Sequence, residues 1–130
     1  MAQMKPAASE YVTLVELLEL TGSFEEFEEA VQAAARRLEA EGIRELVTLQ
    51  FYATPGSPEV GAILTFADRD RMMDHIELIT GWEEFEWFLG VVKPIDVRVY
   101  GKLSPEAEAW VSQFDVLNRT FEDHVAGFVR

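Results

Sequence analysis

Residues 43–67 read IRELVTLQFYATPGSPEVGAILTFA, and the topology of the whole chain can be built outward from them. Two runs rich in β-branched, aromatic and leucine side chains, 43–53 and 60–67, flank the segment TPGSPE. Proline, glycine and serine in such a short segment are typical of a turn between strands. We therefore predict two antiparallel strands joined as a hairpin.

A segment with helical periodicity lies on each side of this hairpin. Before it, apolar residues recur every three or four positions between Ser23 and Gly42. Ser23 with Glu26 forms a capping box, and Gly42 is a suitable stop. After the hairpin, Asp68 or Asp70 begins a second helix. The sequence Thr80-Gly81-Trp82-Glu83 then predicts an interruption followed by a second capping box, which divides this helix into two pieces.

One further strand is expected at each end of this arrangement. Residues 11–20, YVTLVELLEL, alternate so that Val12, Leu14, Leu18 and Leu20 share one face, and residues 95–100 read IDVRVY. The order of elements is then β-α-β-β-α-β. This order predicts an α+β fold, the ferredoxin-like sandwich.

The C-terminal part of the chain is predicted to form one more helix. Ser104-Pro105 places proline at the favoured first helical position. Apolar residues then form a stripe on a helical wheel: Ala107, Trp110, Val111, Phe114, Leu117, Phe121, Val125 and Phe128. We thus divide the chain into a flexible lead-in (1–10), a ferredoxin-like domain (11–103) and an amphipathic helix (104–130) that packs on the domain or on a partner.

The predicted strands are apolar on both faces, which indicates that both faces are covered. In the strand 43–53, Val47, Leu49 and Phe51 share one face, while Leu46 and Tyr52 lie on the other. Two helices cover only one face of a four-stranded sheet, and monomers rarely expose large apolar patches. A homodimer with sheets packed face to face follows as a hypothesis.

Composition excludes several classes of function. The chain has 130 residues, enough for one domain, and a formal net charge of −13, which opposes binding to nucleic acids and anionic membranes. No apolar run is long enough to cross a bilayer. The chain has no cysteine and only two histidines, and no metal-ligand spacing occurs. We expect a cytoplasmic, acidic protein without a metal site.

Two segments together resemble the antibiotic-biosynthesis-monooxygenase-like members of the dimeric α/β-barrel superfamily. They are EVGAILTFADRDRMMDHIELITGWEEFEWFL (59–89) and IDVRVYGKL (95–103). The matching features are an acidic turn after a strand (66–70), His75 on the following helix, an aromatic short helix after Gly81, and the closing strand 97–100. The resemblance covers about residues 11–103 and implies the fold and a dimer.

The resemblance also implies a pocket between sheet and helices, which some members use to oxidise hydroxyaromatic polyketides with O₂ and no cofactor. By position, His75 would line this pocket and act as the base, because an imidazole near neutrality can take a phenolic proton. The walls would come from Met72, Trp82 and Phe85, and from either Phe51 or Tyr52, depending on strand register. The alternative is that His75 is a half-buried structural residue and that the aromatic residues are core.

Two functional hypotheses follow. The first is a small-molecule-binding protein that acts as a cofactor-independent monooxygenase on a hydroxyaromatic or polyketide-like compound. The second is a non-catalytic module of the same fold that binds a small apolar or aromatic ligand, or another protein. Neither hypothesis includes a cofactor.

Overall fold

The computed structural model describes residues 8–114 and 116–130, which form a mixed sheet with helices. A 3-10 turn at Ala8–Glu10 precedes β1 (Val12–Leu20), α1 (Phe24–Glu41), β2 (Leu46–Ala53), β3 (Glu59–Phe66), α2 (Arg71–Ile79), α3 (Glu83–Val91), β4 (Val92–Tyr100), α4 (Pro105–Val111) and β5 (Leu117–Phe121). Of the predicted flexible lead-in, residues 1–7 lie outside the described residues.

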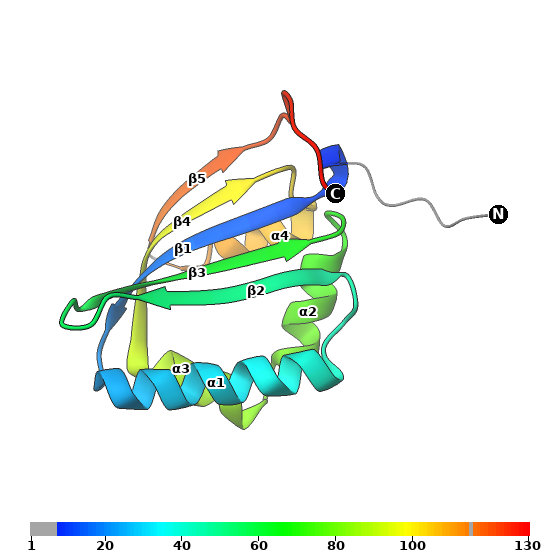
Figure 1. The fold of residues 1–130 in the computed structure, drawn as a ribbon. Helices are drawn as coiled ribbons and strands as arrows, with labels where there is room; N and C mark the ends of the chain where they lie inside the picture. The colour runs from blue at the N-terminus through cyan, green and yellow to red at the C-terminus, as the bar shows by residue number, and fades with distance from the viewer. Residues whose placement is uncertain (1–7, 115) are drawn as a thin grey trace.

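The sheet has the strand order β2-β3-β1-β4-β5, with β1 at its centre (Figure 1). β1 is antiparallel to both β3 and β4, and β2 and β3 form the predicted antiparallel hairpin. Together with α1 and the α2–α3 pair, these strands give the β-α-β-β-α-β unit. The predicted ferredoxin-like α+β fold is confirmed.

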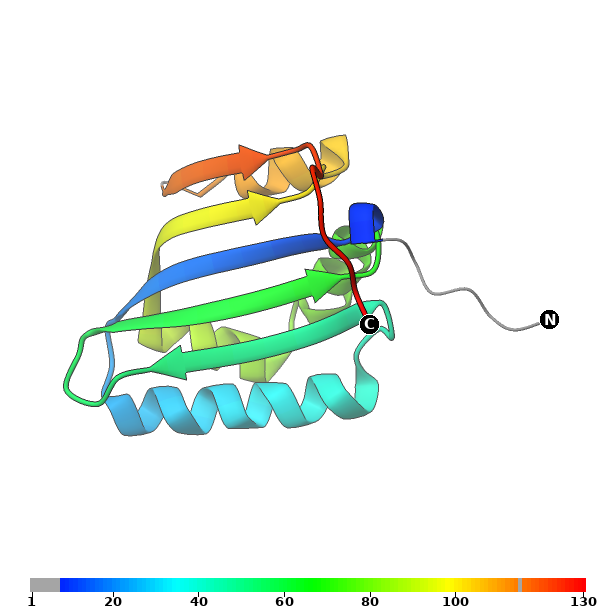
Figure 2. The ribbon, with the colours of Figure 1, turned by 45° about the horizontal axis from the view of Figure 1, so that its top comes forward.

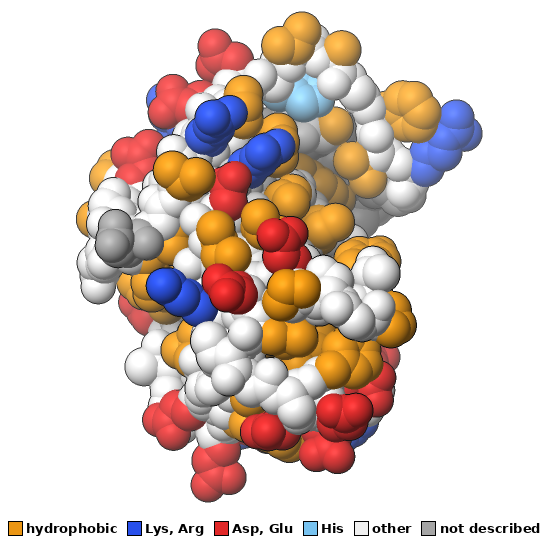
Figure 3. Space-filling model, turned by 90° about the vertical axis from the view of Figure 1, so that its left-hand side faces the viewer, with side chains coloured by type: hydrophobic (Ala, Val, Ile, Leu, Met, Phe, Trp, Pro, Cys, Tyr) orange, Lys and Arg blue, Asp and Glu red, His pale blue; other side chains and the backbone are white. Residues whose placement is uncertain are grey.

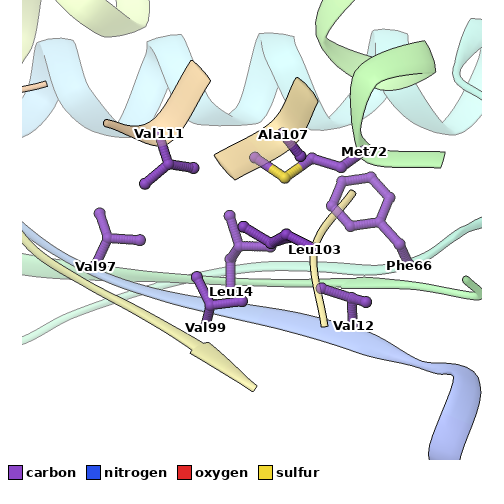
Figure 4. Packing of buried hydrophobic residues seen from close by; sticks show 9 residues of the cluster. All are labelled: Val12, Leu14, Phe66, Met72, Val97, Val99, Leu103, Ala107 and Val111. Carbon is purple, nitrogen blue, oxygen red and sulfur yellow. The ribbon is translucent and has the colours of Figure 1, made fainter. Parts of the chain in front are cut away.

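All four described α-helices pack on one face of the sheet (Figures 1 and 2). One core cluster lies between the sheet and α2 and α4 (Figure 4) and contains Val12, Leu14, Phe66, Met72, Val97, Val99, Leu103, Ala107 and Val111. A second cluster lies under α1 and α3 and contains Leu18, Phe27, Ala30, Val31, Val60, Ala62, Val91 and Val92. The opposite face of the sheet carries no helix among the described residues.

The predicted helix boundaries have clear physical causes. Ser23 Oγ accepts a hydrogen bond from the Glu26 amide at 3.1 Å, so the first cap forms as expected. Gly81 adopts a φ of +90°, a conformation that favours glycine, and this residue separates α2 from α3. The second capping box is wrong. Trp82 occupies the N-cap position of α3, and Thr80 Oγ1 donates instead to the Ile76 carbonyl at 2.6 Å.

The prediction of one long C-terminal helix is also wrong beyond Val111. The chain turns after α4, and Leu117–Phe121 pairs in parallel with β4 as a fifth strand. Phe121 thereby stacks on Tyr100, with ring centroids 5.2 Å apart. Residues 117 and 121 are separated by four positions, which is both one helical turn and an even number of strand residues. The apolar stripe therefore could not distinguish the two conformations.

A second correction concerns β2. Its register with β3 shifts between Leu46 and Thr48, which marks a bulge. As a result Leu46 packs against the core, whereas Val47 is 47% exposed. The predicted shared face of Val47, Leu49 and Phe51 holds only for the last two residues, because one irregular residue reverses the alternation.

Candidate ligand-binding site

A cavity of about 120 Å³ lies between the covered face of the sheet and the helices. Strands β1 to β4, all four helices and the segment that follows α4 contribute to its lining. The lining consists of Leu14, Glu16, Leu18, Ala34, Leu38, Leu49, Phe51, Leu64, Phe66, Met72, His75, Ile76, Ile79, Trp82, Phe85, Phe88, Leu89, Pro94, Val97, Trp110, Val111, Phe114 and Val116. Almost all of these side chains are apolar, so the cavity is suited to an apolar ligand body.

Glu16 is the one carboxylate among the described residues that line the cavity. It lies in the central strand β1, opposite Ala62 of β3 and Val97 of β4, on the same face as Leu14 and Leu18. Among the described residues it has no side-chain hydrogen bond and no ion pair. Burial raises the pKa of Glu16 from 4.5 to about 7, because the surrounding apolar atoms disfavour the charged form. Glu16 is only partly exposed and lines the cavity.

The strand pairing next to Glu16 is irregular. The register between β1 and β4 shifts between Leu17 and Leu18, so that Leu17 pairs with Asp96 and Leu18 with Pro94. Pro94 itself lines the cavity. Such bulges bend a strand and redirect side chains, and they are frequent beside functional sites.

His75 is the second titratable group in the cavity lining. It lies on α2, is 3% exposed, and packs its ring on Phe66 with centroids 5.5 Å apart. Its Nδ1 atom is buried without a hydrogen-bond partner in the described structure. Burial lowers the pKa of His75 from 6.5 to about 4, so the imidazole is neutral at neutral pH.

All but one of the other predicted site residues line the cavity. Met72, Trp82, Phe85 and Phe51 all line the cavity together with His75. Tyr52 does not, because it is 59% exposed and its neighbour Phe51 takes the cavity-facing position. The register thus selects Phe51, and Tyr52 is wrong as a residue of this cavity.

An interaction between α1 and the start of α3 holds Trp82 at the cavity. The Arg37 guanidinium lies 3.9 Å from the centroid of the Trp82 ring and donates to Glu84 at 2.8 Å. Arg37 also donates to Glu41 at 3.1 Å. A planar guanidinium can stack and pair at the same time, so one side chain fixes both the ring and the helix start.

Glu16 was missed in the sequence, although a signal was present. The apolar positions Val12, Leu14, Leu18 and Leu20 alternate with period two, and Glu16 occupies the position between Leu14 and Leu18. A carboxylate on the covered face of a central strand is unusual and indicates a site.

In the described part of the chain, no group of three or more acidic or histidine residues could hold a metal ion. None of the helices described here is long and apolar enough to cross a membrane.

Comparison with known proteins supports the fold. No family model matches the sequence, and no curated protein matches it. Among solved structures, MupZ from Pseudomonas fluorescens is similar with a TM-score of 0.64 and 11% identity, covering 91% of this chain and 95% of that one. SnoaB from Streptomyces nogalater, a cofactor-independent oxygenase, is similar with a TM-score of 0.60 and 12% identity, covering 73% and 95%.

A third similar structure comes from Caulobacter crescentus CB15 and is provisionally named an antibiotic biosynthesis monooxygenase. It has a TM-score of 0.53 and 14% identity, covering 72% of this chain and 90% of that one. At such identities the likeness shows the fold alone. The fold is ferredoxin-like and is shared with these solved structures, in agreement with the fold that the sequence resemblance predicts.

Proposed function

We propose that the protein binds a small hydroxyaromatic compound in the cavity and oxidises it with O₂ without a cofactor. The observation that carries this proposal is an apolar cavity that contains two uncompensated titratable groups, Glu16 and His75. Buried groups with strongly shifted pKa values cluster at functional sites. The likeness of the fold to SnoaB, a cofactor-independent oxygenase, is consistent with this chemistry.

The size of the cavity limits the ligand. An engineered protein cavity of about 150 Å³ takes up benzene. The present cavity, at about 120 Å³, is of the same order and suits one aromatic ring. Leu89 and Phe114 are 44% and 41% exposed and mark its accessible end, where a larger polyketide-like compound would extend.

His75 supports the proposed chemistry as a neutral hydrogen-bonding group. Its unpartnered Nδ1 can bind a ligand hydroxyl, or take its proton as the sequence analysis proposes. A deprotonated hydroxyaromatic is electron-rich enough to transfer an electron to O₂. The apolar walls, including Phe85 and Trp82, would exclude water from the reactive anion.

Binding without turnover is the second candidate. It is favoured by the low pKa of His75, about 4, which makes this imidazole a weak base at neutral pH. In that case the cavity would capture an apolar or aromatic compound and leave it unchanged.

We further propose that the protein is a homodimer that packs through the uncovered face of the sheet. Leu17, Tyr100 and Phe121 on this face are 36%, 42% and 52% exposed. Figure 3 shows hydrophobic side chains gathered around a hollow on one side of the molecule, with basic and acidic side chains among them. A twofold interface brings the same surface of both copies together, which suits such a mixed patch.

Charges on the uncovered face favour the same arrangement. Asp96 Oδ2 lies 3.8 Å from Arg98 Nη2. The other carboxylate oxygen, Asp96 Oδ1, is buried without a hydrogen-bond partner in the described structure. Arg119 of β5 is in register with Arg98 of β4. A second copy that approaches about a twofold axis could place one of these cations against the unpaired carboxylate oxygen.

The proposed function is tested by ligand binding and oxygen uptake on the wild type and on His75→Phe. A ligand at a hundred times its Kd stabilises a protein by about 2.7 kcal/mol, which raises the melting temperature by several degrees. We expect such a rise with catechol or hydroquinone. We also expect the wild type to consume O₂ faster than the uncatalysed reaction, and His75→Phe to consume it more slowly than the wild type. Stabilisation without O₂ uptake would favour the second candidate. No stabilisation by one-ring or larger hydroxyaromatics would contradict both.

A further inference from the structure

We propose that Glu16 accepts the proton of the ligand's acidic O–H group, and that the cavity therefore selects an uncharged compound with a weakly acidic hydroxyl group. This inference rests on the proposed function and assigns the proton-accepting role to a residue other than His75. Three features of the structure carry it: the position of Glu16, the lack of a charge partner for Glu16 among the described lining residues, and the apolar character of the space that it faces.

The backbone position of Glu16 is well fixed, because β1 is the central strand of the sheet. β1 is hydrogen-bonded to a neighbouring strand on each side, and Glu16 lies in register with Ala62 of β3 and Val97 of β4. Groups placed on central strands are held more precisely than groups on loops. The irregularity beside it lies in β4, where Ile95 is the extra residue between Asp96 and Pro94. The carboxylate is thus a fixed feature of the cavity floor.

Among the described residues that line the cavity, none compensates the charge of Glu16. The side chains that line the cavity from α1, α3 and α4 are apolar or tryptophan, as are those from β2, β3 and β4. Apart from Glu16, His75 of α2 is the one titratable residue of the described lining, and it is neutral at neutral pH. No lysine or arginine lines the cavity in the described structure. The ligand must therefore supply the hydrogen-bond donor for Glu16.

This arrangement discriminates by charge. A carboxylate or phosphate on the ligand would face Glu16 without any cation to offset the repulsion, which is costly in an apolar cavity. An apolar ring without a donor would bury the Glu16 carboxylate and leave it unpaired. A neutral ring with a hydroxyl group avoids both costs.

The chemical step is a single proton transfer. The ligand O–H bond breaks, its electron pair stays on the ligand oxygen, and the proton forms an O–H bond with the Glu16 carboxylate. The products are a neutral carboxylic acid and an aryloxide anion, so charge is conserved. Because burial raises the pKa of Glu16 to about 7, this carboxylate is a stronger base than an ordinary one and is still half ionised near neutral pH. His75 would then bind or position the ligand.

The test compares three one-ring probes of similar size: phenol, toluene and benzoate. Their Kd values are measured by amide NMR titration on the full chain at about pH 5.5 and about pH 8.5, on either side of the Glu16 pKa of about 7. Phenol should bind more tightly at the higher pH, by up to about 30-fold if only ionised Glu16 accepts it. Toluene should show the opposite trend, because it prefers the neutral acid. Benzoate should bind more weakly than phenol at both values.

Glu16→Gln keeps the shape of the side chain but removes the base, and Glu19→Gln is its matched control on the same strand at an exposed position. We expect Glu16→Gln to weaken phenol binding at the higher pH by about 10- to 100-fold and to abolish the pH dependence, while Glu19→Gln changes neither. If Glu16→Gln does not fold, the opposite pH trends of phenol and toluene in the wild type decide the question.

Three outcomes would overturn the inference. Equal, pH-independent binding of phenol and toluene would leave the cavity as a ligand site but remove Glu16 from its chemistry. Tighter binding of benzoate than of phenol would contradict the selection of uncharged ligands. If none of the probes binds, both this inference and the proposed function fail.

Discussion

His75 packs against Phe66 with ring centroids 5.5 Å apart and ring planes inclined by 58°. This contact places a histidine from α2 against β3, where the histidine side chain is almost completely buried. The imidazole thus shares one apolar cavity with Glu16, and burial moves the pKa values of the two groups in opposite directions. The opposed shifts make the pH dependence of stability a sensitive probe of the site.

The wild type should show little pH dependence of stability from these two groups between about pH 4.5 and 6.5. The folded pKa of His75 lies below its unfolded value of 6.5, so its contribution is lost as pH falls from 6.5 towards 4. The folded pKa of Glu16 lies above its unfolded value of 4.5, so its contribution is lost as pH rises from 4.5 towards 7. In the shared window the two slopes cancel. Urea unfolding at several pH values measures the free energy of unfolding, which contains the sum of the two contributions.

Single variants should separate the two slopes. In Glu16→Gln, only His75 remains, and the free energy of unfolding should rise by about 3 kcal/mol as pH increases from 4 to 6.5. In His75→Phe, only Glu16 remains, and the free energy should fall by about 3 kcal/mol as pH increases from 4.5 to 7. Identical profiles for the two variants would mean that neither group titrates as the structure implies.

Filling the cavity should abolish ligand binding while the protein stays folded. Ala34 lines the cavity from α1, and Ala34→Leu places a larger apolar side chain into that space. The stability should change by less than about 2 kcal/mol, because the cavity can accept added carbon atoms. Ala40→Leu makes the same chemical change at an exposed position of the same helix. The melting temperature with and without catechol checks this; retained binding in Ala34→Leu would place the ligand elsewhere.

Arg37→Ala should destabilise the protein and loosen the wall of the cavity. The substitution removes the stacking on Trp82 and the hydrogen bond to Glu84. Arg37 is one-third exposed and its ion pairs are screened by solvent, so we expect the melting temperature to fall by only a few degrees. Arg36→Ala on the exposed side of α1 is the control. Equal effects of the two substitutions would show that the Arg37 contacts contribute nothing specific.

Ile63→Glu should dissociate the proposed dimer. Ile63 is in register with Val15 and Gln50 on the uncovered face, where two glutamates would be buried together in a twofold interface. Gln32→Glu on the exposed side of α1 adds the same charge away from this face. Sedimentation velocity should give a dimer for the wild type and Gln32→Glu, and a folded monomer for Ile63→Glu. A monomeric wild type would contradict the proposed assembly.

Much of the fold follows from local signals in the sequence. The hairpin turn, the Ser23 cap and the break at Gly81 depend on a few neighbouring residues, and each lies where its chemistry predicts. The failures involve pairing between distant segments. β5 exists because β4 offers a free edge, and Val47 is exposed because β2 bulges against β3. Neither pairing is encoded in a local pattern.

The candidate site was predicted only in part. His75, Met72, Trp82, Phe85 and Phe51 do meet in one cavity, because family position and strand alternation place them on the covered face. Glu16 was not predicted, because a glutamate in a strand is usually exposed to solvent. The choice between Phe51 and Tyr52 needed the true register of β2, which the bulge sets.

β5 pairs only with β4, and all five of its residues are exposed. Little buried apolar surface resists its detachment, so its opening costs far less than unfolding of the central strands. Amide hydrogens of Leu117–Phe121 should therefore exchange with solvent long before those of β1. Phe114 and Val116 line the cavity and lead directly into β5, so detachment of this edge strand would also loosen that part of the cavity wall.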